Sequence, residues 1–65
     1  MNTYHIYQDY TGNFQAAIRI RNGKTNDRYI KAGPMSGSVK CRWTGYTVEA
    51  ATAEEADEKY YEGDY

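Results

Sequence analysis

The chain has 65 residues, with one cysteine, eight tyrosines and a formal net charge of −1 at pH 7. This length fits a single domain (residues 1–65), and one cysteine excludes an internal disulfide framework. No apolar run approaches the roughly 18 residues of a membrane span, and the polar segment Met1 to Tyr10 lacks the apolar core of a signal peptide, so we expect a cytoplasmic protein with no membrane contact.

The first third of the chain alternates side chains with a period of two, which predicts strands. Thr3–Tyr10 is the first expected strand, and Thr11-Gly12-Asn13 is the turn that follows it. In the second strand we expect one face to form the core and the other to meet solvent. The expected core positions are Phe14, Ala16, Ile18 and Ile20. The expected outward positions are Gln15, Ala17, Arg19 and Arg21.

The middle of the chain combines turn signals with short alternating runs. Asn22-Gly23 predicts a second turn, and the Gly-Pro and Ser-Gly pairs of Gly33–Ser38 are typical of a loop. Thr44-Gly45 predicts a tight connection between two further strands. The strands expected in this region are Arg28–Ala32, Val39–Trp43 and Tyr46–Ala50.

The last segment has the signals of a helix. Thr52-Ala53-Glu54-Glu55 fits a capping box, and Gly63 is a plausible stop, so we expect a helix from Ala53 to about Tyr61. Ala53, Ala56 and Tyr60 lie on one stripe that can pack on a sheet. We therefore expect an α+β fold: a small antiparallel sheet of about four or five short strands with one C-terminal helix packed on one face.

Charge is segregated along the chain. Residues 1–45 contain seven Lys or Arg and two acids, whereas residues 46–65 contain seven acids and Lys59 alone. The near-neutral total therefore combines a basic body with an acidic end. Such a distribution indicates binding partners rather than a reaction.

The sequence predicts no catalytic, metal or cofactor site. His5 and Cys41 are the single residues of their types, so they cannot form a zinc site within one chain. A Cys41–His5 dyad is conceivable, but Cys41 falls on an inward register, where a thiol has little thiolate character. We expect a protein that is not an enzyme and binds no cofactor.

The acidic end predicts a surface that binds a larger protein. Carboxylates at helical spacing among tyrosines can replace nucleic-acid phosphates in the basic groove of a partner. A solvated helix face with no partner is the alternative interpretation. The candidate partner-binding residues are Glu54, Glu55, Asp57, Glu58, Tyr61, Glu62 and Asp64.

Direct binding of nucleic acid is the second hypothesis. If their strands are neighbours, four outward cations would form a basic patch on the open side of the sheet, with His5 and Tyr7 in the same outward register. Cations with aromatic side chains on a sheet are typical of single-strand binders. Ordinary solubility is the alternative here. The candidate nucleic-acid-binding residues are Arg19, Arg21, Lys40 and Arg42.

In type, the chain resembles the small anti-CRISPR proteins of phages and mobile elements. Like them it is very short, has a compact β-rich body and no catalytic motif, and has an acidic, tyrosine-rich end at Thr52–Tyr65. The resemblance implies stoichiometric blocking of a CRISPR effector complex, with a type I complex as the first expectation, at the surface that receives DNA. If the protein is phage-encoded, the cytoplasm in which we expect it is that of the host cell. We expect a monomer or weak dimer.

Overall fold

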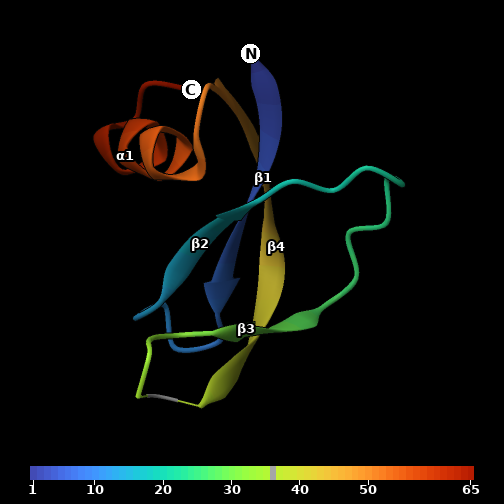
Figure 1. The fold of residues 1–65 in the computed structure, drawn as a ribbon, viewed down its shortest axis with the longest axis vertical. Coiled ribbons are helices and arrows are strands. Elements are labelled where there is room, and N and C mark those ends of the chain that lie inside the picture. Colours follow the sequence, from blue (N-terminus) through green and yellow to red (C-terminus); the bar gives the residue numbers. More distant parts are fainter. Residues whose placement is uncertain (36) are drawn as a thin grey trace.

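The structure is a computed structural model that describes residues 1–35 and 37–65. One antiparallel sheet has the strand order β2-β1-β4-β3, and a C-terminal helix packs on one face of it (Figure 1). The elements are β1 Asn2–Asp9, β2 Gln15–Ile18, β3 Arg28–Lys31, β4 Ser38–Ala50 and α1 Ala53–Glu62. The predicted α+β class, with an antiparallel sheet and one C-terminal helix, is confirmed.

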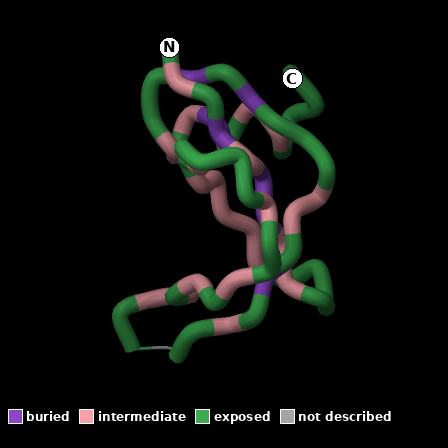
Figure 2. Tube along the Cα trace, turned by 90° about the vertical axis from the view of Figure 1, so that its right-hand side faces the viewer, coloured by how far each residue is buried: buried purple, intermediate pink, exposed green. Residues whose placement is uncertain are grey.

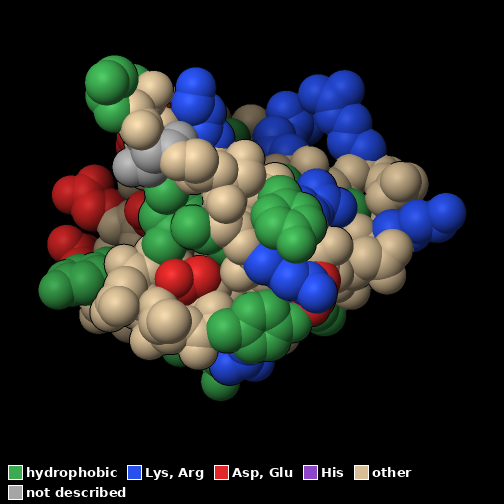
Figure 3. All heavy atoms as spheres, turned by 90° about the horizontal axis from the view of Figure 1, so that it is seen from below, with side chains coloured by type: hydrophobic (Ala, Val, Ile, Leu, Met, Phe, Trp, Pro, Cys, Tyr) green, Lys and Arg blue, Asp and Glu red, His purple; other side chains and the backbone are tan. Residues whose placement is uncertain are grey.

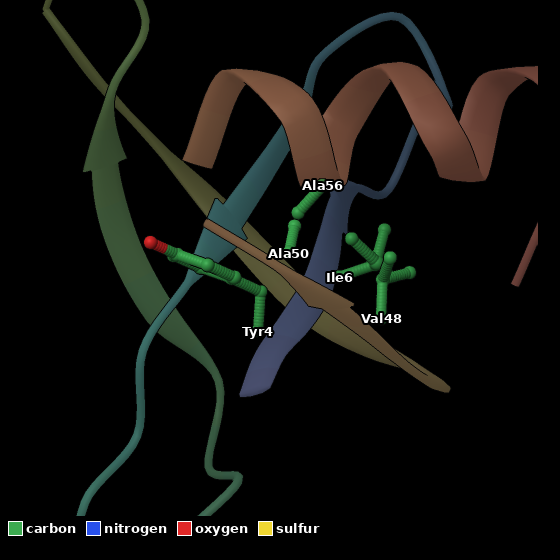
Figure 4. Packing of buried hydrophobic residues seen from close by; sticks show 5 residues of the cluster. All are labelled: Tyr4, Ile6, Val48, Ala50 and Ala56. Atoms are coloured by element: carbon green, nitrogen blue, oxygen red, sulfur yellow. The ribbon is translucent and has the colours of Figure 1, made fainter. Parts of the chain in front are cut away.

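The main core lies between α1 and the sheet. Figure 4 shows Ala56 of the helix directed toward Ala50 of β4, with Ile6 of β1 beside them. Small side chains at this contact let the helix approach the strands closely, as a well-packed interior requires. The buried cluster is Tyr4, Ile6, Val48, Ala50 and Ala56. The partly buried residues packed against it are Ala17, Ala53 and Tyr60.

The faces of β2 are the reverse of the prediction. Ala17 lies opposite Ile6 and packs on the helix-side core, whereas Ala16 lies opposite Tyr7 on the other face of the sheet. The expectation that Phe14, Ala16, Ile18 and Ile20 would form the core face is therefore wrong. Both faces of β2 are half-buried, so the larger apolar side chains do not mark the side that the helix covers.

A second buried face lies on the side of the sheet away from α1. Tyr7 and Cys41 are both fully buried there, and Tyr7 lies opposite Trp43 of β4. The hydroxyl of Tyr7 donates a hydrogen bond to the carbonyl of Asn26 at 2.9 Å, which ties the segment between β2 and β3 to the sheet. The prediction that Tyr7 points outward is wrong, because this segment covers it.

The long strand β4 replaces the two strands expected around Thr44-Gly45. Three residues, 44–46, lie opposite Ile6 of β1, so the predicted turn is instead a bulge within one strand. Gly45 has φ +94, a backbone conformation that favours glycine. The hydroxyl of Thr44 donates to the Ile6 carbonyl at 2.9 Å and holds the bulge against β1. Both halves of β4 therefore pair with the same strand.

The ends of α1 follow the sequence signals. The Glu55 amide donates to the Thr52 side-chain oxygen at 3.2 Å, which is the N-cap bond of a capping box, and such a cap contributes about 1 kcal/mol. The Glu55 carboxylate pairs with Lys59. Gly63 has φ +79 and ends the helix, with its amide bonded to the Tyr60 carbonyl. No helix in the described residues is long and apolar enough to cross a membrane.

The hairpin of β3 and the start of β4 extends from the body as an arm (Figure 2). The described positions from Arg28 to Lys40 are exposed or intermediate, and Met35 in the connection is 97 % exposed. The amide of Ala32 donates to the carbonyl of Gly37 at 3.5 Å across this connection. The loop predicted over Gly33–Ser38 includes Ser36, which lies outside the described residues, and Ser38 already belongs to β4.

Asp9 organises the turn between β1 and β2. Its carboxylate accepts hydrogen bonds from the Thr11 hydroxyl and from the amides of Asn13 and Phe14, at 2.8, 2.9 and 3.2 Å. The hydroxyl of Thr11 and these amides favour the charged form, so they lower the pKa of Asp9 below its ordinary value. The turn is therefore most stable when this carboxylate is ionised.

The stability contributed by Asp9 should be lost in acid. Because its pKa is lower in the folded chain, the unfolded chain binds a proton more readily, and stability falls as the pH drops from the unfolded pKa through the folded one. Asp9→Asn should remove this dependence, so its urea-unfolding midpoint should differ from wild type more at pH 6 than at pH 3. Thr11→Val should be intermediate. An unchanged difference at both pH values would contradict the expectation.

Candidate functional site

A groove with an acidic wall lies between α1 and the turn that joins β1 to β2. Its volume is about 590 Å³. The turn side is formed by Gly12, Asn13, Phe14 and Gln15. The helix side is formed by Glu54, Asp57, Glu58, Tyr61 and Glu62. We call these nine residues the acidic groove.

Three carboxylates form a row along the helix wall. Glu54, Glu58 and Glu62 follow one another at intervals of four residues, which places them on one side of α1 with steps of about 6 Å. All three are exposed. Like charges at this spacing repel one another by a few tenths of a kcal/mol per pair, so the row weakens the isolated helix rather than stabilising it.

The fourth carboxylate of the groove is held in place. Asp57 is half-buried, and its Oδ1 accepts a hydrogen bond from the side-chain amide of Gln15 on β2. Gln15 in turn accepts a bond from the side chain of Gln8 on β1 at 3.1 Å. This chain of amides links the helix wall to two strands and orients the Asp57 carboxylate.

The acids of α1 are not neutralised by the cations of the strands. In the described parts of the chain, 1–35 and 37–65, the one ion pair joins Lys59 to Glu55 at 3.4 Å, within the helix itself. The ammonium of Lys59 also donates to the Glu49 carbonyl at 3.0 Å. An anionic surface therefore remains along the groove.

The structure gathers five of the seven residues that the sequence suggests for partner binding. These five, which line the acidic groove, are Glu54, Asp57, Glu58, Tyr61 and Glu62. Glu55 instead pairs with Lys59, and Asp64 lies beyond the helix end. Phe14 and Gln15 were not suggested by the sequence, because only the packing of the β1–β2 hairpin on α1 brings them to the groove.

The tyrosines of the acidic end have two different environments. Tyr60 and Tyr65 stack against each other at 4.8 Å between ring centroids, and Tyr46 of β4 lies 5.8 and 5.1 Å from them. This cluster fastens the C-terminal residues to the sheet. Tyr61 is 87 % exposed and is the tyrosine that lines the acidic groove, so a partner in the groove would contact it.

The suggested basic residues separate into two groups. Lys40 and Arg42 are exposed on β4, whereas Arg19 and Arg21 follow β2, and β1 lies between those two strands. The guanidinium of Arg42 lies 5.9 Å from the ring centroid of Tyr10. Figure 3 shows this end of the molecule from below, with Lys and Arg side chains around exposed hydrophobic ones.

Tyr10 is held at this basic end by a carboxylate. Its hydroxyl donates a hydrogen bond to Asp27, the residue that precedes β3. That hydrogen bond raises the pKa of Tyr10 above its ordinary value, because it stabilises the protonated hydroxyl. The ring therefore spans from the end of β1 to the start of β3.

The geometry disfavours nucleophilic chemistry at the single thiol. Burial raises the pKa of Cys41, which keeps the thiol protonated. Cys41 lies opposite Asp9, four residues along β1 from His5, a separation of about 13 Å in an extended strand. His5 instead contacts Trp43, at 5.5 Å between ring centroids. The two residues do not form a dyad.

The described residues hold no group of three His, Cys, Asp or Glu side chains that could bind a metal ion. The acidic groove presents carboxylates that can accept hydrogen bonds from cations, beside the exposed Tyr61. Comparison of the chain with protein-family models, with curated proteins and with solved structures gave no match.

Proposed function

We propose that this protein is a non-enzymatic inhibitor that binds a basic surface of a larger protein through its acidic groove. The observation that carries this function is the row of Glu54, Glu58 and Glu62, exposed beside Tyr61 and without ion pairs to the strands in the described residues. The row repels itself in the free chain, and a basic partner would relieve that repulsion.

The groove has the composition that a protein interface needs. Tyr61 on one wall and Phe14 on the other supply aromatic contact area, and the carboxylates around them supply charge complementarity. Asp57 is already oriented by Gln15, so binding does not have to order it. Lys or Arg side chains of the partner would enter between the two walls.

Within this class we propose that the partner is a CRISPR effector complex, with a type I complex as the first candidate. The short chain, the small β-rich body and the acidic, tyrosine-rich end support this choice by resemblance to anti-CRISPR proteins. Evenly spaced carboxylates on a helix would occupy the positions of DNA phosphates and exclude DNA from its channel.

Reversal of two groove charges tests the function. Glu54→Lys with Glu58→Lys should weaken binding to an immobilised, purified type I effector complex by at least roughly 100-fold, because each reversal replaces an attraction with a repulsion. Glu49→Lys with Asp64→Lys makes the same change in net charge outside the groove and should retain most of the affinity. Biolayer interferometry measures both, and circular dichroism checks that the variants fold.

Three outcomes would count against the function. Equal loss of affinity in the two double variants would show that net charge alone matters and that the groove has no special role. Unchanged affinity of the groove variant would remove the groove from the contact. Failure of the wild-type protein to bind the complex would reject a type I effector as the partner.

A further inference from the structure

We infer that the end of the sheet opposite α1 binds single-stranded nucleic acid through a face made of aromatic rings and cations. We call this the basic aromatic face. Its residues are Tyr10, Tyr29, Lys31, Lys40 and Arg42. None of them lines the acidic groove, so this face is a surface distinct from that of the proposed inhibitory contact.

Strand register places these side chains on one surface. Lys40 of β4 lies directly opposite Tyr29 of β3, and residues paired in this way point to the same face. Lys31 is two residues after Tyr29 on β3, and Arg42 is two residues after Lys40 on β4. Residues two apart in a strand point to the same side of the sheet, so all four share the face. Arg42 then contacts Tyr10, which directly follows β1.

The two rings lie beside the cations of β4. The ring of Tyr10 runs from the end of β1 toward β3, because its hydroxyl bonds to Asp27, two residues before Tyr29. Tyr10 and Tyr29 are 60 % and 70 % exposed, and the guanidinium of Arg42 lies over the Tyr10 ring, so Tyr29 is the ring more open to a stacked base. Lys40 and Arg42 are exposed on β4 next to the rings, where they can reach the phosphates of a bound strand.

The strand β4 is paired on both sides where this face begins, at Cys41. Cys41, between Lys40 and Arg42, is fully buried on the other side of β4 and lies opposite both Asp9 of β1 and Arg28 of β3. The ring of Tyr10 is fixed at its hydroxyl by Asp27. A pre-positioned ring and a strand bonded on both sides lose little freedom when a ligand binds.

Charge and shape together select a single strand as the occupant. The face has three cations, Lys31, Lys40 and Arg42, and one neighbouring carboxylate, Asp27. Asp27 already accepts a hydrogen bond from the Tyr10 hydroxyl. Phosphates match that charge, and exposed rings need unpaired bases on which to stack, which a duplex does not offer. An acidic peptide would match the charge but would leave both rings without a stacking partner.

Fluorescence anisotropy with labelled oligothymidine at low salt tests this site. Tyr29→Ala should weaken binding about 5- to 150-fold, the usual range for loss of one stacked base, while Tyr29→Phe keeps the ring and the affinity. Tyr61→Ala removes an even more exposed ring from the acidic groove and should leave binding unchanged. The salt dependence should have a slope of about −2 on logarithmic axes for three cations.

Charge-matched variants separate a site from general attraction. Lys40→Gln with Arg42→Gln should weaken binding and reduce the salt slope by more than Lys24→Gln with Arg21→Gln, which removes the same charge off the face. Equal effects of the two pairs, or equal effects of Tyr29→Ala and Tyr61→Ala, would overturn the assignment. The assignment would also be overturned if duplex DNA bound as tightly as the single strand, or if polyglutamate competed as strongly as a single strand does. Absence of binding by the wild-type chain would overturn it as well.

Discussion

Tyr7→Ala is expected to remove a large share of the stability of the fold. Tyr7 is fully buried, and its hydroxyl holds the Asn26 carbonyl. Truncating a large buried aromatic side chain costs about 3–5 kcal/mol, whereas a domain of 65 residues has a free energy of unfolding of only about 3–10 kcal/mol. A urea titration followed by circular dichroism should show a free energy of unfolding lower by about 3–5 kcal/mol, with the midpoint moved to much lower urea.

Two milder substitutions, Tyr7→Phe and Tyr29→Ala, calibrate the loss of stability expected for Tyr7→Ala. Tyr7→Phe keeps the buried ring and removes only the bond to Asn26, so it should lower the free energy of unfolding by about 1 kcal/mol. Tyr29→Ala removes an exposed ring and should change it by less than about 0.5 kcal/mol. A near-wild-type unfolding midpoint for Tyr7→Ala would show that the face away from α1 contributes little to stability.

The helix was predictable because its signals are local. Thr52, Glu55 and Gly63 act within one or two turns of their own positions, and the structure has the cap, the helix and the stop that they indicate. The short strand β3 was found for the same reason, since Arg28–Lys31 lies between clear turn signals. In these segments the local signals were enough to place the element, although β3 is completed by its pairing with β4.

The sheet was harder to predict because its pairing is long-range. Thr44-Gly45 has the residues of a tight turn, but the same glycine conformation serves a bulge. Only the partner strand distinguishes a turn from a bulge here. The carbonyl of Ile6 accepts a hydrogen bond from the Thr44 hydroxyl, and both halves of β4 pair with β1. The faces of β2 depend in the same way on which side α1 covers.

The candidate sites were likewise predictable where their signals are local and not where they depend on long-range contacts. The acidic wall of the groove was predictable from helical spacing, but the opposite wall, with Phe14 and Gln15, depends on the contact between α1 and β2. At the basic end, Tyr29 alternates with Lys31 in the sequence, which could have indicated a shared face. Tyr10 had no local signal, because Arg42 and Asp27 reach it from distant parts of the chain.

Ala56→Leu should lift α1 from the sheet and distort the acidic groove. Ala56 is fully buried and faces Ala50, so no space exists for a branched side chain at this contact. Overpacking of this kind costs about 1–3 kcal/mol, which for a domain of this size lowers Tm by roughly 4–20 °C. Thermal unfolding by circular dichroism measures the first effect, and binding to the effector complex measures the second, which should also be weakened.

Ala51→Leu and Ala56→Gly are the controls that separate volume from stability. Ala51 is exposed just before α1, so leucine there should leave both Tm and binding near wild type. Ala56→Gly destabilises a helix interior by about 1 kcal/mol without added volume, so the groove should keep its shape and its affinity. If Ala56→Leu bound as tightly as Ala56→Gly, the position of α1 on the sheet would not matter for the contact, and the groove could not be the surface that recognises the partner.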